Sequence, residues 1–374
     1  MMKKRLDHWI TVIAFCGAMA IMAALFLVLP ERDFSETEKR YLEKFPTFSW
    51  EKLASGEFGA DIETYMADHI PGRDFLVGLN AYFENVTGRQ VAKDIYCAED
   101  GRLVEKPVQW NGAQAAQNMM AINLFAETIG TDVDFMIVPS GGWAVEEHLT
   151  GFTDPYMDEQ YISDLYALAG ENLNTMDMVS LFKTMDGRDL YYRTDHHWTS
   201  KGAYMAYRHY MQQKGKPYRL QQQFTIQTEE GFYGTTYSRS ALWLTQTEPL
   251  EMWHGSQNLQ VTNGETEGVH AGVFYEERLE EIDKYTVYLD GNHSMVRIEN
   301  PDNAGKGKLL VIRDSYANCL GCFLAESYET VVLVDLRYYK NPISELYAQE
   351  GFDDVLVSYS LSNFMTDTNL VWLR

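Results

Sequence analysis

The sequence predicts an α/β protein built on a doubly wound parallel sheet, with a β-rich insertion and an N-terminal transmembrane helix. Three observations support this prediction. Strands alternate with helices after residue 306, short alternating runs fill the segment before it, and a long uncharged run opens the chain. The chain has 374 residues, of which 45% are hydrophobic. This content can build a substantial core and excludes wholesale disorder.

The uncharged run at residues 9–29 is long enough to cross a lipid bilayer, because about 20 apolar residues in a helix span the hydrocarbon core. Three basic residues at positions 3–5 precede the run and favour a cytoplasmic N-terminus. A cleaved signal peptide is the alternative, since residues 18–20 resemble a small-x-small cleavage site. The run stays apolar well beyond that point. We therefore expect residues 1–30 to be a cytoplasmic tip and cell-membrane anchor, with the remaining chain extracytoplasmic.

Residues 31–80 predict a membrane-proximal stalk that leads into an amphipathic helix. The segment is polar and acidic, and apolar residues recur at helical spacing in its later half. Pro71-Gly72 marks the end of the helix. The apolar positions are Leu53, Phe58, Ile62 and Tyr65.

Residues 81–374 predict one large domain in which helices and strands alternate. Its first part has a helical segment at 111–129, a buried strand in DVDFMIVP, a helix within 156–180, and a helix that Thr199 caps and Gly215 ends. Its last part alternates strictly, which implies right-handed crossovers and a parallel sheet covered on both faces. The expected strands there are KLLVIRD, TVVLVDL and DDVLVSY, and the expected helices are SYANCLGCFLAES and ISELYAQEG.

Residues 220–306 differ from their surroundings in sequence pattern and predict the β-rich insertion. Short alternating runs such as TVYL and SMVRI are separated by Gly, Asn and Asp, as in antiparallel strands and loops.

The charge of the chain excludes several classes of partner. There are 31 Lys and Arg residues against 54 Asp and Glu, for a net charge of -23. Nucleic acids and anionic head groups bind to local positive charge, so we expect no nucleic-acid partner and a bilayer contact only through residues 9–29.

The first stretch that could support catalysis is Asp314-Ser315, between an apolar strand and the next helix. In a doubly wound sheet, sites form at the carboxyl ends of the strands. A serine on such a turn can expose its hydroxyl, and N–H groups at the helix start can stabilise an oxyanion. Asp and Ser are also ordinary N-caps, and taken alone the pair favours that simpler interpretation.

The second stretch is YRTDHHWT, which holds Asp195 and His197 two residues apart. A catalytic serine needs a base, and the base needs an orienting carboxylate. In an extended segment, residues two apart project to the same side, so both could face Ser315. The intervening His196 is then expected to point the other way, and Trp198 is most simply a core residue.

Metal binding is an alternative for Asp-His-His, but the other histidines are scattered and supply no second cluster. Of the four cysteines, Cys319 and Cys322 form a CxxC. This spacing fits a redox pair, half a metal site or two packing residues. Without a second CxxC, packing residues are the preferred interpretation, with a local disulfide as an open possibility.

The stretch TDHHWTSKGAY, followed later by RDSYAN, resembles the DHHW protein family of bacteria. That family is similar to alginate O-acetyltransferase-like proteins, whose catalytic domains are SGNH-hydrolase-like. FSETEKRYLEKFP, GEFGADIETYMADHIPGRD and GFYGTTYSRSA also resemble segments of the family. Together these segments cover most of the chain after the anchor. The resemblance implies an SGNH-hydrolase-like doubly wound sheet.

The resemblance also implies a role for each motif residue. Ser315 matches the nucleophile, and Asp195 and His197 match the Asp-x-His pair that precedes it. Typical SGNH hydrolases have the serine first and Asp-x-x-His last, so the order here implies a circular permutation of the site.

Two departures from the SGNH pattern concern the surroundings of Ser315. Arg313 stands where the pattern has Gly, and no segment matches the Gly and Asn of the usual oxyanion hole. The Ser315 N–H is the expected oxyanion donor, and Asn318 and Ser140 are further candidates.

We therefore expect an O-acetyltransferase-like protein that modifies a cell-surface or exported polysaccharide, with no cofactor and no metal. In this mechanism His197 takes the Ser315 proton, Ser315 attacks an acetyl carbonyl, and Asp195 holds the imidazolium. Acetyl-CoA is not available outside the cell, so a partner must supply acetyl groups. The family resemblance suggests a membrane-bound O-acyltransferase.

Two alternatives remain. A carbohydrate esterase would use the same triad and transfer the acetyl group to water. A non-catalytic carbohydrate-binding or assembly protein would instead present an aromatic groove, with Trp198, Trp243 and Trp253 as candidates, and Ser315 would be only a helix cap.

Overall fold

The computed structural model describes residues 2–35, 40–87, 91–92, 94–98, 100–149, 153–264 and 268–373. The chain forms two compact units, residues 1–93 with 238–243, and residues 94–237 with 244–374. The predicted boundaries at residues 30 and 80 stay predictions. Part of the front segment that resembles the family, residues 36–39, lies outside the described residues.

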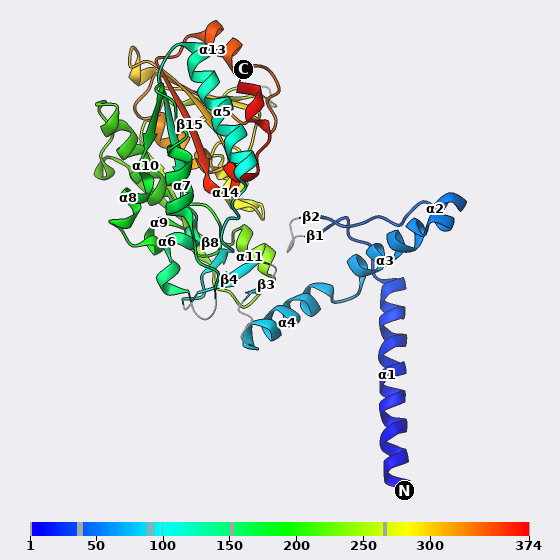
Figure 1. The fold of residues 1–374 in the computed structure, drawn as a ribbon. Coiled ribbons are helices and arrows are strands. Elements are labelled where there is room, and N and C mark those ends of the chain that lie inside the picture. Colours follow the sequence, from blue (N-terminus) through cyan, green and yellow to red (C-terminus); the bar gives the residue numbers. More distant parts are fainter. Residues whose placement is uncertain are drawn as a thin grey trace. The chain divides into compact units, whose positions relative to one another are not determined.

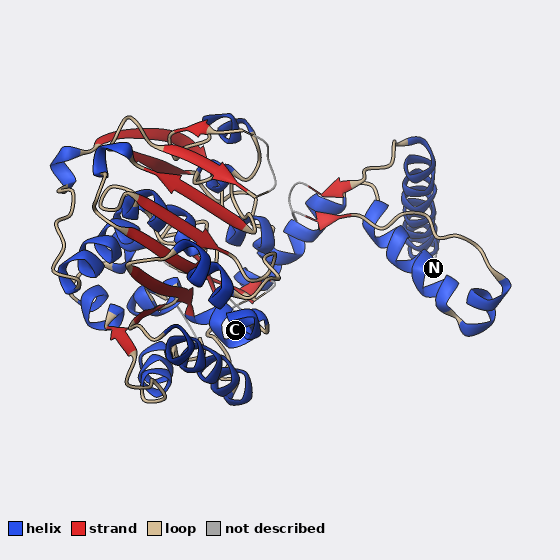
Figure 2. Ribbon diagram, turned by 90° about the horizontal axis from the view of Figure 1, so that it is seen from above, coloured by secondary structure: helices blue, strands red, loops and turns tan. Residues whose placement is uncertain are grey.

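An eight-stranded mixed sheet forms the centre of the larger unit (Figures 1 and 2), in the order β11-β10-β12-β14-β13-β15-β6-β7. The five strands from β14 to β7 are parallel, and β12, β10 and β11 continue the sheet with antiparallel pairing. The strands are β6 (Val133–Val138), β7 (Leu173–Met176), β10 (Gln260–Asn263), β11 (His270–Ala271), β12 (Met295–Glu299), β13 (Lys308–Arg313), β14 (Thr330–Val334) and β15 (Asp354–Ser360).

Helices cover both faces of this sheet, as the alternating sequence predicts. On β13, Leu309 and Val311 join the core cluster under α10 and α12. Leu310 and Ile312 join the cluster on the opposite face, under α5, α7, α13 and α14. Strands buried on both faces read as nearly continuous apolar runs. The helices are α5 (Gly112–Ile129), α7 (Asp158–Tyr166), α10 (Ser200–Gln213), α12 (Tyr316–Leu324), α13 (Ile343–Glu350) and α14 (Leu361–Thr366).

The expected strands and helices of the last part are all present, as are α5, β6 and α10. Thr199 caps α10 by accepting a hydrogen bond from Gly202 N at 3.2 Å. Two details differ. The segment 156–180 holds α7, the edge strand β7 and the start of α8 (Met178–Lys183), rather than one helix alone. TVYL is not a strand, because its first two residues end the 3-10 turn Lys284–Val287, Tyr288 forms only an isolated bridge with Phe274, and Leu289 has a positive φ of 57°.

The expected β-rich insertion contains strands, but most of them do not form a separate layer. Strands β8 (Thr225–Phe232) and β9 (Glu248–His254) pair antiparallel with each other. Strands β10, β11 and β12 instead extend the main sheet from β14. A short helix, α11 (Thr235–Ser240), follows β8.

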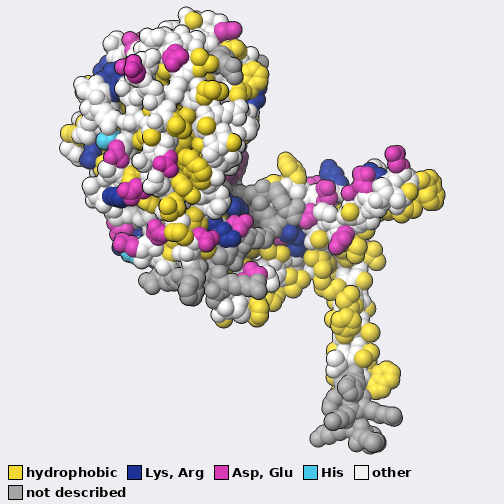
Figure 3. Space-filling view, viewed as in Figure 1, with side chains coloured by type: hydrophobic (Ala, Val, Ile, Leu, Met, Phe, Trp, Pro, Cys, Tyr) yellow, Lys and Arg dark blue, Asp and Glu magenta, His cyan; other side chains and the backbone are white. Residues whose placement is uncertain are grey.

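The smaller unit contains α1 (Met2–Val28), α2 (Trp50–Ser55), α3 (Glu57–His69), α4 (Arg73–Val86) and the short pair β1 (Phe34–Ser35) and β2 (Arg40–Tyr41). Within α1, Trp9–Val28 is the one helix in the described part of the chain that is long and apolar enough to cross a membrane. Hydrophobic side chains predominate along it (Figure 3). The amphipathic helix expected before Pro71 is divided at Gly56, whose φ of 83° terminates α2 in the left-handed conformation.

Candidate active site

Ser315 lies at the carboxyl end of β13, between the parallel neighbours β14 and β15, at the start of α12. Its side chain makes no capping hydrogen bond. Asp314 takes that role, because its Oδ1 accepts from Tyr316 N at 3.0 Å. The Ser315 hydroxyl instead lies 2.8 Å from Nε2 of His197. The interpretation of Ser315 as only a helix cap is therefore wrong.

The DHHW residues sit on a tight loop between α9 (Gly187–Leu190) and α10. An antiparallel bridge between Tyr191 and Trp198 closes the loop, and Tyr192 N donates to His197 O at 3.2 Å. The buried Arg102 holds its first half, since one guanidinium nitrogen donates to Tyr191 O at 2.7 Å and to Tyr192 O at 2.9 Å. These contacts hold the backbone in a bend rather than an extended strand.

Glu248 holds the middle of the same loop. Its carboxylate accepts from Arg193 N at 2.7 Å and from the backbone N and hydroxyl of Thr194, both at 2.6 Å. The Glu248 carboxylate on β9 thus accepts the hydrogen bonds that a neighbouring strand would otherwise accept from two consecutive backbone N–H groups. Burying those N–H groups without an acceptor would cost free energy. These hydrogen bonds fix the backbone conformation of the loop up to Asp195.

Asp195 accepts four hydrogen bonds and orients His197. Its Oδ1 lies 2.5 Å from His197 Nδ1 and accepts from His197 N at 2.8 Å, and its Oδ2 accepts from Thr235 N at 2.7 Å and Thr235 Oγ1 at 2.9 Å. Burial disfavours the charged carboxylate, but the favourable electrostatic interactions with His197 and His196 and these hydrogen bonds outweigh it. The pKa of Asp195 is therefore held well below its usual range.

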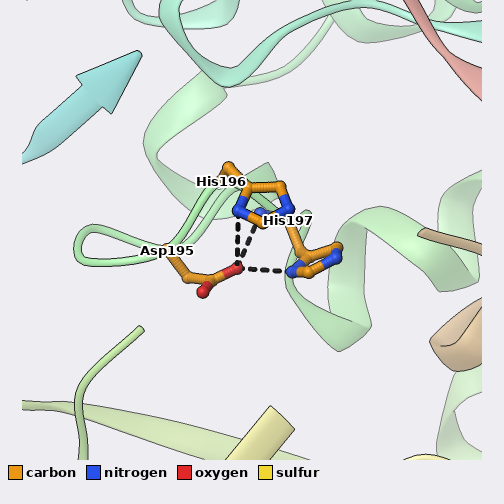
Figure 4. Close-up of side chains that lie close together, drawn as sticks. All are labelled: Asp195, His196 and His197. Carbon is orange, nitrogen blue, oxygen red and sulfur yellow. Dashed lines mark hydrogen bonds and ion pairs between the residues drawn. The ribbon is translucent and has the colours of Figure 1, made fainter. Parts of the chain in front are cut away.

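His196 does not point away from His197, as an extended segment would require. The two rings are in contact, with their centroids 3.9 Å apart and an interplanar angle of 35°, and both face Asp195 (Figure 4). The reason is the bend. Asp195 accepts from the backbone N of His197, which turns the chain within the motif and removes the two-residue alternation of a strand.

Two aromatic residues complete the support of His197. The ring of Tyr285 stacks face to face on the imidazole, with centroids 3.9 Å apart and an interplanar angle of 6°. Trp198 is fully buried, as expected for a core residue, and its indole Nε1 donates to Tyr316 O at 3.0 Å. This bond joins the DHHW loop to α12 next to Ser315.

A metal ion does not fit these side chains well. Asp195, His196 and His197 are the one group of possible ligands found among the described residues, with their ligand atoms within 4.8 Å of one another. Both oxygens of Asp195 already face N–H and O–H donors, and the second nitrogen of His197 faces Ser315. A cation would have to displace donors that repel it.

Comparison with known proteins identifies the family of the chain. The model of the family described as DHHW protein matches residues 118–334. This chain belongs to the DHHW family.

Solved structures show the same fold at low sequence identity. A DHHW family protein from Eubacterium siraeum is 21% identical, with a TM-score of 0.62, and the match covers 75% of this chain and 97% of that one. PatB1 from Bacillus cereus, in a structure with a sulfonyl adduct, is 20% identical with a TM-score of 0.61, and the match covers 73% and 96%. Curated protein sequences give no significant match.

Both side chains expected to complete the oxyanion hole of this DHHW protein make a hydrogen bond within the protein, and their role stays a prediction. Asn318 donates through Nδ2 to Asn292 Oδ1 at 3.1 Å. Ser140 caps α6 (Gly141–Ala144), where its hydroxyl accepts from Trp143 N at 3.3 Å. Both are engaged within the protein.

Asn292, which sequence reasoning did not single out, is hydrogen-bonded to two residues near Ser315, Arg313 and Asn318. Its Oδ1 accepts from Asn318 and, at 3.0 Å, from the buried Arg313, and its Nδ2 has no hydrogen bond to another residue in the described part of the chain. Leu289, Asp290 and Gly291 precede it with φ of 57°, 63° and 79°, a strained turn of the kind found at functional sites. The signal was the Gly-Asn pair in LDGNHS, which lies before Ser315 in sequence within the supposed insertion.

A pocket opens beside Asp195 and His196 at the carboxyl end of the sheet. The loops after β6, β13 and β15 all contribute, through residues 140–142, Tyr316 and residues 360–362. Ligand sites of open α/β sheets occupy this position.

The remaining cysteine and tryptophan predictions concern the core. Cys319 and Cys322 are free, buried residues of α12, and burial raises the pKa of Cys319 to about 12. They pack in the core cluster under α10 and α12, as the preferred interpretation stated. Trp253 is buried like Trp198, so neither can line an open groove.

Proposed function

We propose that this DHHW protein is an extracytoplasmic, membrane-anchored O-acetyltransferase that modifies a polysaccharide through a Ser-His-Asp acyl-enzyme. The observation that supports it is the chain of hydrogen bonds from Asp195 through His197 to a serine hydroxyl that leaves the capping role to its neighbour. A hydroxyl bound to an oriented imidazole is an activated nucleophile.

In the proposed first step, Ser315 Oγ attacks an acetyl carbonyl while His197 Nε2 takes the hydroxyl proton. The ionised Asp195 stabilises the imidazolium, and the Ser315 N–H together with Asn292 Nδ2 stabilises the oxyanion. The imidazolium then gives its proton to the departing oxygen of the donor, and the acetyl group stays on Ser315.

In the second step a sugar hydroxyl attacks the acetyl-serine. His197 takes the proton of that hydroxyl and returns it to Ser315 as the ester passes to the sugar. The reversed order of the motif, with Asp195 and His197 before Ser315, is proposed to be a circular permutation of the SGNH site. A membrane-bound O-acyltransferase would supply the acetyl group, and residues 9–29 would hold the chain in the membrane.

Two other functions are weaker. An esterase would run the same first step and use water in the second. The carbohydrate-binding alternative loses support because two of its three candidate tryptophans are buried. That alternative also treats Ser315 as a helix cap, whereas the capping hydrogen bond is made by Asp314.

The test uses the purified full-length chain in detergent. We expect it to release p-nitrophenol from p-nitrophenyl acetate and to gain one sulfonyl group from phenylmethylsulfonyl fluoride on Ser315, by mass spectrometry. The Bacillus relative, whose structure holds a sulfonyl adduct, motivates the reagent. Ser315→Ala and His197→Ala should each lower the rate by at least about 10³-fold.

The control variant Ser180→Ala removes an exposed serine on α8 and should leave rate and labelling unchanged. Equal rates in all four proteins, with folding intact by circular dichroism, would overturn the proposal.

A further inference from the structure

We propose that His196 binds a hydroxyl group of the acceptor sugar, through an Nε2 that carries no proton, in the pocket beside the triad. This inference rests on the proposed function and extends it, because it assigns the acceptor a place and a chemical class.

Thr235 determines which nitrogen of His196 carries the proton. The Thr235 hydroxyl lies 2.9 Å from Oδ2 of the ionised Asp195 and 2.5 Å from His196 Nδ1. A hydroxyl has one proton to donate, and a carboxylate can only accept. Thr235 therefore donates to Asp195 and accepts from His196. The proton of a neutral His196 sits on Nδ1, and Nε2 presents a lone pair.

The neutral form of His196 is the favoured one. Burial and the nearby His197 lower the pKa of His196, and the attraction of Asp195 offsets this only in part. Formation of a cation on His197 during catalysis, 3.9 Å away between ring centroids, opposes protonation of His196 further.

The bare Nε2 is available to a ligand. It has no hydrogen-bond partner in the part of the chain that the structure describes, and 26% of the His196 side chain is exposed. A lone pair accepts from a hydroxyl but repels a carboxylate or phosphate. Glu105 and Asp195 on the same wall add to that repulsion, while the cations there are bound: Lys106 pairs with Asp94 at 2.8 Å and Arg102 with backbone carbonyls.

The remaining polar lining suits a neutral, hydroxyl-rich ligand. Ser140, Ser362 and the backbone of Gly141 and Gly142 face the pocket. Because the His196 ring contacts the imidazole that binds Ser315, with centroids 3.9 Å apart, a sugar held at Nε2 lies next to an acetyl group on that serine. Its hydroxyls are thereby close to the reacting carbonyl, which is the condition for transfer to compete with water.

The experiment separates the two half-reactions of the full-length chain. The burst of p-nitrophenol measures acetylation of Ser315. Mass spectrometry then measures the fate of the acetyl group in the presence of neutral oligosaccharides: chitopentaose, maltopentaose and cellopentaose. The readout is the ratio of acetylated sugar to acetate. His196→Phe keeps a flat ring but removes the acceptor atom, and we expect the ratio to fall roughly threefold to tenfold, the effect of one lost hydrogen bond.

His196→Gln restores an acceptor oxygen near the position of Nε2 and should recover part of that ratio. The matched control is His209→Phe, a partly exposed histidine on α10, which should give the wild-type ratio. An equal ratio in His196→Phe and wild type overturns the inference. So does a wild type that acetylates Ser315 but none of the neutral sugars. Absence of the burst in wild type would instead overturn the proposed function itself.

Discussion

At the scale of single residues, the site depends on how Asp195 is satisfied. Four donors meet its two oxygens, and they come from His197 and Thr235. The same carboxylate therefore selects the tautomer of His197, selects the tautomer of His196 through Thr235, and bends the backbone between them. These three effects of Asp195 explain why the two histidines follow it directly in sequence rather than at alternate positions of a strand.

The lowered pKa of Asp195 makes a prediction about acid stability. The pKa of Asp195 in the folded protein lies below the value of about 3.9 for an unfolded aspartate. Its contribution to stability is therefore fully present above about pH 4 and is lost as the pH falls through the folded pKa. We expect the free energy of unfolding, measured by urea titration, to fall more steeply below about pH 4 in wild type than in Asp195→Asn. Parallel acid slopes for the two proteins would contradict the account.

At the scale of elements, β13, α12 and the loop before α10 must meet correctly. The indole of Trp198 joins the loop to α12. Asp314 joins β13 to β15 and α14, since its Oδ2 accepts from Ser360 N at 2.8 Å and from Asn363 Nδ2 at 2.8 Å. Such contacts between segments distant in sequence hold Ser315 and His197 at hydrogen-bond distance.

Glu248 provides the test at this scale. Glu248→Gln places an amide NH₂ against N–H groups of Arg193 and Thr194 that now share a carboxylate. We expect a loss of about 1–3 kcal/mol in the free energy of unfolding, together with slower ester hydrolysis because the DHHW loop loosens. Chemical denaturation and the p-nitrophenyl acetate assay measure the two effects. The control is Glu229→Gln on β8, the strand paired with β9, where the carboxylate forms a partly exposed ion pair with Lys284. This change should alter the free energy of unfolding by less than about 1 kcal/mol. An equal loss in Glu229→Gln would argue against a specific role for Glu248.

At the scale of the whole molecule, the chain combines an apolar N-terminal helix with an acidic remainder. The helix at Trp9–Val28 is compatible with a single-pass anchor. The net charge of -23 gives the rest of the chain no general attraction for anionic lipid.

We therefore expect full-length protein to stay in the membrane fraction after carbonate washing, and a variant lacking residues 2–29 to become soluble. Protease added outside intact spheroplasts should digest the larger unit. Release of the full-length chain by carbonate, or protection of that unit, would contradict the predicted anchor and orientation.

The sequence by itself determined the class of fold and two of the site's segments. Continuous apolar strands separated by helices specify a parallel sheet buried on both faces, and the motifs at 194–198 and 313–318 are local enough to be read directly. Short-range patterns are preserved in the sequence because hydrophobic periodicity and capping act between neighbouring residues.

Only the tertiary structure decided how those segments work. It assigned the cap to Asp314, turned His196 toward His197, and placed Thr235 and Glu248 in contact with the DHHW loop. It also joined β10–β12 to the main sheet. These features depend on hydrogen bonds and strand pairings between residues far apart in sequence, and such contacts leave no periodic trace in a single chain.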